Sequence, residues 1–326
     1  MKKMIILEEK EKIYIDVYHI GYSKQGEGSL FILYTDTGKV LYSLAIDCYE
    51  ESQCNETRNI LKYWKLEKKL NMFIWTHPHD DHSIGVKEII QTFCNNNSVI
   101  CIANILSLKE KCSDVCKKNI EYIQTLTSRK TVKNKWHINS MVHFPEIMDE
   151  VYFIGECEIK KLVVQCISPV TELGGMEAGK KNPDFNMMSI GCIVKIKMKD
   201  QNINFLFAGD MEHYTIEKLI EEESESIPNI YNYIKIPHHG SENAENMIEY
   251  LGFDNGMKSE FASVSVFVKH GLPKRKVLDT YRNVVEQIGC TSDINTKKYG
   301  LGVIRLRYDL EARRVLHRFY GTATFC

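Results

Sequence analysis

The sequence predicts a layered α/β fold. Apolar or alternating runs that are typical of strands recur along the chain, and stretches with helical spacing follow several of them. Histidine and aspartate residues stand directly after several of these runs, where layered α/β folds gather ligands because strand ends hold the loops in place. The 326 residues are 44% hydrophobic and 26% charged, which is typical of a globular protein with a sizeable core.

The N-terminal part of the chain is predicted to form strands separated by glycine-containing turns. These apolar or alternating runs lie at residues 13–17, 29–34 and 40–47. Residues 52–70 are highly charged and are predicted to be helical. The region is therefore predicted to contribute mainly sheet, followed by a helix.

A cluster of histidines comes next, in the segment His77-Pro78-His79-Asp80-Asp81-His82, directly after an apolar run at 72–75. An amphipathic helix is predicted after it, from the i, i+3, i+4, i+7 spacing of Val86, Ile89, Ile90 and Phe93. Histidine is the commonest protein ligand for transition metals, and a neighbouring carboxylate suits a divalent ion. Imidazoles and a carboxylate gathered on one strand-to-helix turn therefore predict a metal site.

The second half of the chain repeats this order of strand and helix. Strand-like runs lie at 203–208 before Asp210, at 230–236 before His238 and His239, and at 261–268 before His270. A helix is predicted after Asp210, and another over residues 277–288, from their apolar spacing. These polar residues are therefore predicted to converge on one edge of a sheet.

The bulk properties exclude several classes of protein. The net charge is −1, so no global field draws the chain to nucleic acid or to an anionic membrane. No apolar run approaches the length of a bilayer span, and acidic residues end the N-terminal apolar stretch too early for a signal peptide. The odd number of cysteines, 11, and the missing signal favour reduced thiols and a cytoplasmic location.

No repeat or low-complexity linker divides the chain, which predicts a single domain over residues 1–326 with a segment inserted at about 105–150. From Lys109 to Lys135 this segment has eight basic residues against three acidic ones, and a helix is expected around 112–126. One interpretation is the solvated face of an inserted helix. The other is a basic cap over the metal site that receives an anionic substrate.

The motifs, in this order, resemble the metallo-β-lactamase superfamily, and within it the hydrolase domain of the competence protein ComEC and its relatives. The matching segments are Gly26-Glu27-Gly28-Ser29, His77-x-His79-x-Asp81-His82, Asn186-Met187-Met188-Ser189, Gly209-Asp210, Pro237-His238-His239-Gly240-Ser241 and Gly271-Leu272-Pro273. The resemblance spans roughly residues 13–308. It implies a four-layer αββα sandwich, here with a helical basic insertion.

Position by position, the resemblance implies two divalent metal ions. The implied ligands are His77 and His79 for the first metal, Asp81, His82 and His239 for the second, and Asp210 as the bridge. His239 is preferred to His238 because it directly precedes a glycine, as the last histidine ligand does in several members, although the two could be exchanged. Zn²⁺ or Mn²⁺ suits this mixture of imidazole and carboxylate, and Fe²⁺ is a further candidate.

The chain departs from the family pattern at the first metal. Many members supply another histidine to this metal from a loop before the Gly-Asp strand. Here Asn186 stands in that neighbourhood, as in ComEC-like relatives. The first metal would therefore take water or Asn186 in place of an imidazole, and the resemblance leaves open whether one or both positions are filled.

The resemblance implies a hydrolase that uses a metal-activated hydroxide at a dinuclear site. Beyond ligation, Asp81 would orient the nucleophile, His238 would protonate a leaving group, and Ser241 would donate to a phosphate oxygen. ComEC-like relatives imply phosphodiesterase or nuclease chemistry, so the expected substrate is a phosphodiester, with nucleic acid preferred and no membrane partner. The alternatives are hydrolysis of a small ester, lactone or amide on the same metals, and a non-catalytic metal-binding sensor or partner protein.

Overall fold

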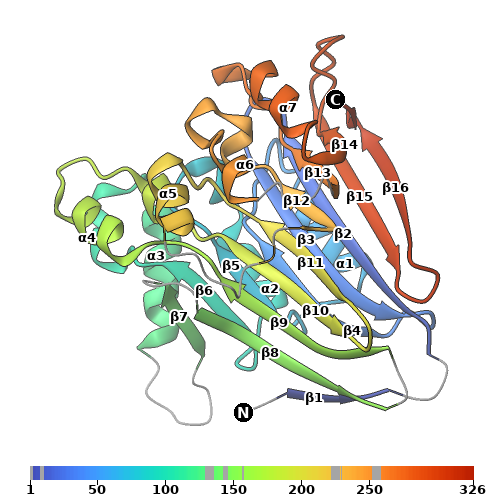
Figure 1. Ribbon diagram of the computed structural model, residues 1–326. Coiled ribbons are helices and arrows are strands. Elements are labelled where there is room, and N and C mark those ends of the chain that lie inside the picture. The colour runs from blue at the N-terminus through green and yellow to red at the C-terminus, as the bar shows by residue number, and fades with distance from the viewer. Residues whose placement is uncertain are drawn as a thin grey trace.

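The computed structural model describes residues 3–7, 11–128, 136–141, 146–155, 158–221, 228, 230–251 and 258–326. Within them, two β-sheets pack against each other, and helices cover the outer face of each sheet (Figure 1). The expected four-layer αββα sandwich is confirmed. No helix in these ranges is both long enough and apolar enough to pass through a lipid bilayer.

The first sheet has eight strands in the order β16-β15-β2-β3-β4-β5-β6-β7. Their bounds are β2 (Ile13–Tyr22), β3 (Glu27–Thr35), β4 (Val40–Ile46), β5 (Met72–Trp75), β6 (Val99–Ala103), β7 (His137–Met141), β15 (Leu301–Asp309) and β16 (Arg314–Gly321). Strands β4 to β7 are parallel, so helices must connect them. The connecting helices are α1 (Glu56–Tyr63), α2 (Val86–Phe93) and α3 (Asp114–Thr127).

The second sheet has nine strands in the order β1-β8-β9-β10-β11-β12-β13-β14-β17. Their bounds are β1 (Lys3–Ile6), β8 (Glu146–Ile154), β9 (Ile159–Cys166), β10 (Cys192–Met198), β11 (Asn202–Phe207), β12 (Tyr233–Lys235), β13 (Ser259–Val264), β14 (Val285–Cys290) and β17 (Thr324–Phe325). Helix α4 (Thr171–Gly179) lies between β9 and β10 in sequence. The parallel strands β11 to β14 are connected through α5 (His213–Glu221), α6 (Met247–Tyr250) and α7 (Arg275–Tyr281).

Two apolar cores hold the layers together. The larger one fills the space between the sheets and continues under α1, α2 and α3, and the smaller one lies under α5, α6 and α7. Phe31 of β3 and Phe205 of β11 meet across the sheet interface with ring centroids 5.2 Å apart, and both are fully buried. Burying one such side chain stabilises the fold by roughly 1.5–3 kcal/mol.

Two of the predicted helices are shorter in the structure. The helix expected over 277–288 is wrong in its second half, because α7 ends at Tyr281 and residues Val285–Cys290 form β14. The apolar residues at 285 and 288 fit helical spacing, but they are buried from a strand of the sheet. The charged stretch 52–70 contains only α1, and turns follow it.

Residues 105–150 contribute elements to both sheets. A 3₁₀ helix (Leu106–Lys111) leads into α3, which matches the helix expected around 112–126, and β7 and β8 follow. Helix α3 buries Cys116, Ile120 and Ile123 in the larger core. Residues 129–135 and 142–145, with part of the predicted basic run, lie outside the described residues.

The expectation of reduced thiols is wrong for one pair. Cys290 and Cys326 form a disulfide, because β17 pairs with β14 and brings the C-terminal residue beside it. Eight other cysteines in the described ranges are free, and seven of these are buried. These seven therefore behave as small apolar side chains of the core.

Candidate metal centre

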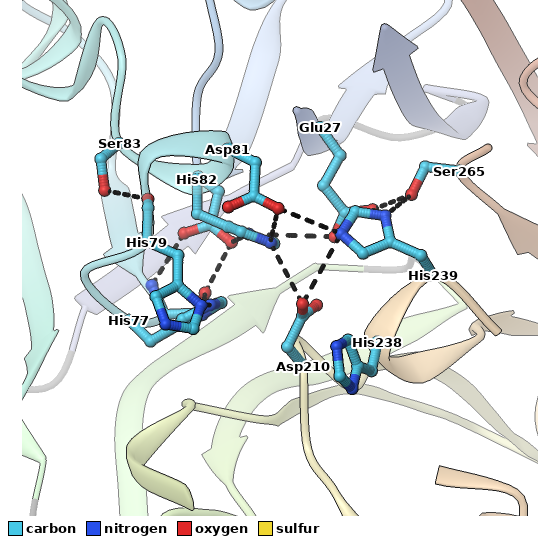
Figure 2. Close-up of polar contacts among 12 residues, drawn as sticks. Glu27, His77, His79, Asp81, His82, Ser83, Asp210, His238, His239 and Ser265 are labelled. Carbon is cyan, nitrogen blue, oxygen red and sulfur yellow. Dashed lines mark hydrogen bonds and ion pairs between the residues drawn. The ribbon is translucent and has the colours of Figure 1, made fainter. Parts of the chain in front are cut away.

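The predicted ligands come from three loops, one after β5 of the eight-stranded sheet and two after the adjacent strands β11 and β12 of the nine-stranded sheet. His77 and His79 follow β5, and Asp81 and His82 lie in the 3₁₀ helix Asp80–His82. Asp210 follows β11, and His239 lies in the turn Pro237–Gly240 after β12. Figure 2 shows these side chains directed toward one another, which places the loops at one rim of the sandwich.

The second metal position is the more completely formed. Nε2 of His82 lies 3.8 Å from Oδ2 of Asp81 and 3.4 Å from Oδ2 of Asp210. Nε2 of His239 lies 3.4 Å and 3.6 Å from the same two oxygens. Both Nε2 atoms are buried and have no hydrogen-bond partner among the described residues. Buried polar atoms nearly always form hydrogen bonds, so two nitrogens that form none and lie 3.4–3.8 Å from two carboxylates fit a bound cation between them.

The electrostatics of this position also fit a cation. Burial lowers the pKa of His82, but Asp210, Asp47 and Asp81 outweigh it and raise this pKa well above its usual value. Burial by itself raises the pKa of Asp210, and the surrounding cationic groups reverse this and hold it well below its usual value. The carboxylates are therefore ionised at neutral pH, as metal ligation requires.

The predicted ligands of the first metal, His77 and His79, lie side by side. Nε2 of His77 lies 3.0 Å from Nδ1 of His79, so two ring nitrogens approach one point. Burial lowers the pKa of both histidines, and their neutral form is the one that binds metal. The ring centroids of His77 and His82 are 4.3 Å apart, which places the two positions side by side.

Asp47, at the end of β4, orients two of the histidines from behind. Its Oδ2 lies 2.7 Å from Nδ1 of His82, leaving Nε2 to face Asp81 and Asp210. The same oxygen accepts a hydrogen bond from the hydroxyl of Thr76 at 2.6 Å, and that hydroxyl also lies 3.0 Å from Nδ1 of His77. Carboxylates in this arrangement fix the tautomer of a ligating histidine and raise its basicity.

A buried ion-pair network lies behind Asp210 and His239. The ammonium of Lys235, 3% exposed as a residue, contacts Oε1 of Glu27 at 2.5 Å, the carbonyl of Gly209 at 2.8 Å and Oδ1 of Asp210 at 3.3 Å. These three acceptors match the three donors of an ammonium group. Burial lowers the pKa of Lys235, but Glu27 and Asp210 outweigh it and raise this pKa.

Glu27 lies within 4.8 Å of the ligand atoms of His82, Asp210 and His239, so distance alone would make it a further ligand. Its oxygens approach Nδ1 of His82 at 3.9 Å and Nδ1 of His239 at 3.5 Å. The carboxylates of Asp81 and Asp210 approach Nε2 of the same rings. Glu27 therefore sits behind the imidazoles, where it accepts a hydrogen bond from Ser265, whose hydroxyl lies 2.7 Å from Nδ1 of His239.

The turn Pro237–Gly240 sends its two histidines to different places. His238, His239 and Gly240 all have left-handed backbone conformations, with φ of 45°, 51° and 73°. His239 points toward Asp81 and Asp210 (Figure 2). Nδ1 of His238 instead lies 2.8 Å from Oε1 of Glu212. A Cβ at position 240 would lie 2.7 Å from Cβ of Pro273, so this turn requires glycine.

Asn186 lies next to this pair, in a 3₁₀ helix (Phe185–Met188) that precedes β10. Its amide nitrogen donates to Oε1 of Glu212 at 3.0 Å. Its Oδ1 is buried and has no hydrogen-bond partner in the described part of the chain. This amide oxygen is therefore free to bind a metal ion. Asn186 also lines the same cleft as His79 and Asp210.

A cleft of about 550 Å³ opens over the two positions. Its lining includes Asp81, Asp210, His238 and His239, the aromatic residues Phe185 and Phe267, and the basic residues Lys111, Lys269 and His270. Lys111, a residue of the predicted basic segment, thus reaches the cleft. Lys109 and Lys117 instead form exposed ion pairs with Glu110, as on a solvated face.

Ser241 is placed differently from the other predicted residues. Its hydroxyl accepts a hydrogen bond from the backbone N–H of Asn243 at 3.3 Å and begins the 3₁₀ helix Glu242–Ala244. It is not among the residues that line the cleft. Its predicted donation to a phosphate oxygen stays a prediction.

Three supporting residues were missing from the sequence-based site. Asp47 ends a predicted strand, Glu27 lies in a motif without an assigned role, and Lys235 interrupts an apolar run. A charged residue at a strand end or inside an apolar run is rarely buried without a partner. That rule was the available signal, but it does not say which partner the residue meets.

Comparisons with known proteins give distant likenesses only. No family model and no curated protein matches the chain. Yeast PDE1 is similar in structure, with a TM-score of 0.42 and 11% identity over 84% of this chain and 96% of that one. The metallo-β-lactamase fold protein YhfI from Bacillus subtilis has a TM-score of 0.30 and 14% identity, over 69% of this chain and 70% of that one.

A third protein of similar structure is MEM-A1, a subclass B3 metallo-β-lactamase isolated from a soil metagenome library. It has a TM-score of 0.28 and 10% identity. The alignment covers 59% of this chain and 60% of the enzyme, so this chain matches less than two thirds of the length of that protein. Likeness at this level says nothing about the substrate. The closer resemblance to the ComEC-like group stays a prediction.

Proposed function

We propose that this chain is a metal-dependent hydrolase that cleaves phosphodiesters at a two-metal centre. The observation that supports a metal centre best is the pair of buried, unpartnered Nε2 atoms of His82 and His239, which face the carboxylates of Asp81 and Asp210. Hydrogen bonding within the described protein leaves these nitrogens unused. A Zn²⁺ or Mn²⁺ ion would use them.

The proposed second metal takes Asp81, His82 and His239, and Asp210 is shared with the first. The proposed first metal takes His77 and His79, with Oδ1 of Asn186 or water in place of a third imidazole. This choice is supported by the buried and unpaired state of that amide oxygen. Because the first position has fewer imidazoles, we expect it to bind metal more weakly than the second.

Metal ions bound here would lower the pKa of a coordinated water and neutralise charge that develops on an attacked phosphoryl group. The protein's own groups would do the rest. The carboxylate of Asp81 would orient the attacking water with the oxygen that does not face the imidazoles. His238, held through Nδ1 by Glu212, would present its other ring nitrogen to the leaving group.

A phosphodiester is preferred over a neutral ester because of the side chains around the cleft. Lys111, Lys269 and His270 line it together with the metal-binding residues. Basic groups at a cleft raise the local concentration of anionic substrates. The volume of about 550 Å³ accommodates a substrate of about nucleotide size.

Turnover of bis-p-nitrophenyl phosphate and of p-nitrophenyl acetate under Mn²⁺ and under Zn²⁺ tests the proposal. We expect turnover of the phosphodiester, its loss in Asp210→Ala, and its retention in Asp200→Ala, whose carboxylate is exposed and pairs with Arg313. Turnover of the acetate ester alone would favour the ester or lactone hydrolase. Metal binding without turnover of either compound would favour the sensor.

A further inference from the structure

A cluster of arginines lies on the outer face of the hairpin formed by β15 and β16. In the register of this hairpin Arg305 stands opposite Arg318, and Arg307 stands opposite Leu316. These four side chains line a small cavity of about 30 Å³. None of them lines the cleft over the metal centre. Strand β16 ends the eight-stranded sheet, at the edge of the molecule (Figure 1).

Two of the guanidinium groups are held in place from below. Asp16 of β2 is fully buried, and its carboxylate accepts hydrogen bonds from Nε of Arg305 at 2.9 Å and from Nε of Arg307 at 3.0 Å. The hydroxyls of Tyr18 and Tyr34 donate to the same carboxylate, each at 3.1 Å. Arginines anchored in this way lose little conformational freedom when they bind a ligand.

The guanidinium groups of Arg305 and Arg307 also stack on aromatic rings, which further restricts their orientation. The guanidinium of Arg305 lies 5.5 Å from the ring centroid of Tyr18, and that of Arg307 lies 5.8 Å from the ring centroid of Tyr34. Cation–π contacts of this kind orient the planar group over the ring. The remaining hydrogen-bond donors of the two arginines are thus preorganised at the cavity.

The cluster has an excess of positive charge. Arg305 and Arg307 share the single carboxylate of Asp16. Arg318 is exposed and forms no ion pair with a carboxylate in the part of the chain that the structure describes. On the same hairpin Arg314 stands opposite Asp309. Four guanidinium groups therefore face two carboxylates, so the surface attracts anions although the whole chain is close to neutral.

Apolar and aromatic side chains alternate with arginine along the edge strand. Leu316 is 61% exposed and Tyr320 is 43% exposed, and Arg318 lies between them on the same face of β16. A row of this kind offers a cation for a phosphate and a ring for a base. Surfaces that bind single-stranded nucleic acid combine these two features.

We propose that this arginine face, defined by Arg305, Arg307, Arg314, Leu316, Arg318 and Tyr320, binds the phosphate backbone of single-stranded nucleic acid. The planar fork of arginine matches the oxygens of a phosphate, and three guanidinium groups line the small cavity toward which a phosphate oxygen would point. An acidic peptide would use the charge but not the exposed ring. Binding at this face does not require the metal centre, so it does not depend on the proposed hydrolysis.

The test measures binding of a fluorescein-labelled oligothymidylate of about 20 nucleotides by anisotropy, in EDTA. Arg318→Glu should weaken binding about tenfold or more and flatten the dependence of affinity on salt, because a phosphate contact is lost. The matched control is Arg282→Glu, which changes an exposed arginine at the end of α7 that pairs with Asp279 and is not part of the arginine face. It should change the affinity less than about twofold.

Equal affinity of Arg318→Glu and the unaltered chain would overturn the proposal. Binding of a polyglutamate peptide as tight as that of the oligonucleotide, and equally sensitive to Arg318→Glu, would overturn it in favour of an acidic protein partner. Circular dichroism of Arg318→Glu checks that its weaker binding is not caused by misfolding. The more conservative Arg318→Lys should fold normally and lose part of the affinity. Turnover of bis-p-nitrophenyl phosphate should be unchanged in Arg318→Glu, which separates this proposal from the hydrolase.

Discussion

Nζ of Lys235 lies 3.3 Å from Oδ1 of Asp210, while Oδ2 of the same aspartate faces the imidazoles of His82 and His239. The two oxygens of one carboxylate thus have different partners. The buried ammonium holds the aspartate from one side, and the metal-facing oxygen is presented on the other. Oδ2 would therefore be the oxygen of Asp210 that binds metal, and Lys235 would position the aspartate by holding Oδ1.

Replacing Lys235 by methionine should lower both metal occupancy and stability. The substitution leaves Glu27 and Asp210 without their buried cation, and breaking a buried pair in this way costs about 3–5 kcal/mol. We expect the Lys235→Met protein to retain less metal after purification, measured by elemental mass spectrometry, and to unfold at lower urea concentration.

The matched control for that change is Lys197→Met, at an exposed position of β10. It also removes one positive charge, but from the surface. The metal content and the urea concentration at the unfolding midpoint should therefore stay close to those of the unaltered chain. Full metal content in Lys235→Met would show that Asp210 does not need this lysine.

Asp47→Asn should weaken metal binding without removing a ligand. The carboxylate lies 2.7 Å from Nδ1 of His82 and directs Nε2 toward the centre. Loss of such a supporting carboxylate typically costs 10–100-fold in metal affinity. Competition titration with a chromophoric chelator measures the change. Asp36→Asn, at an exposed turn, should leave the affinity unaltered, and equal effects of the two substitutions would contradict the role of Asp47.

The stability of the metal-free protein should fall on acidification through Glu27. Burial raises the pKa of this carboxyl, but Lys235, His239 and His19 outweigh it, so the folded-state pKa lies well below the ordinary 4.5. A lowered pKa gives stability that is present above about pH 4.5 and is lost as the pH falls toward the folded value. Urea unfolding in EDTA followed from about pH 6 down to about pH 3 should show a steeper loss below about pH 4.5 for the unaltered chain than for Glu27→Gln. Parallel pH profiles would be evidence against this assignment.

Gly240→Ala should disturb the centre through the backbone. At this position φ is 73°, and the added Cβ would meet Pro273. Gly38 supplies a control, because it has a φ of 82° but nothing within 4 Å of the added Cβ. Both substitutions should cost about 1–2 kcal/mol of left-handed strain. Only Gly240→Ala should also lower metal content, because it shifts the turn that contains His239.

The sequence was sufficient for the layered α/β fold and for the convergence of the strand-end histidines and aspartates, because these residues follow clear apolar runs. It was not sufficient to separate His238 from His239, since both imidazoles are adjacent and only the left-handed turn sends them apart. It also could not place Glu27 or Lys235 beside Asp210, because these contacts join strands that are distant in the chain. The second half of the helix predicted at 277–288 failed for a related reason, since burial in a sheet and burial under a helix leave similar apolar spacing.

Anomalous diffraction from crystals grown with Mn²⁺ or Zn²⁺ tests the metal centre most directly. We expect a peak about 2.0–2.3 Å from Nε2 of both His82 and His239, close to the facing oxygens of Asp81 and Asp210, and a weaker peak beside His77 and His79. Absence of any peak among these six side chains at saturating metal would contradict it.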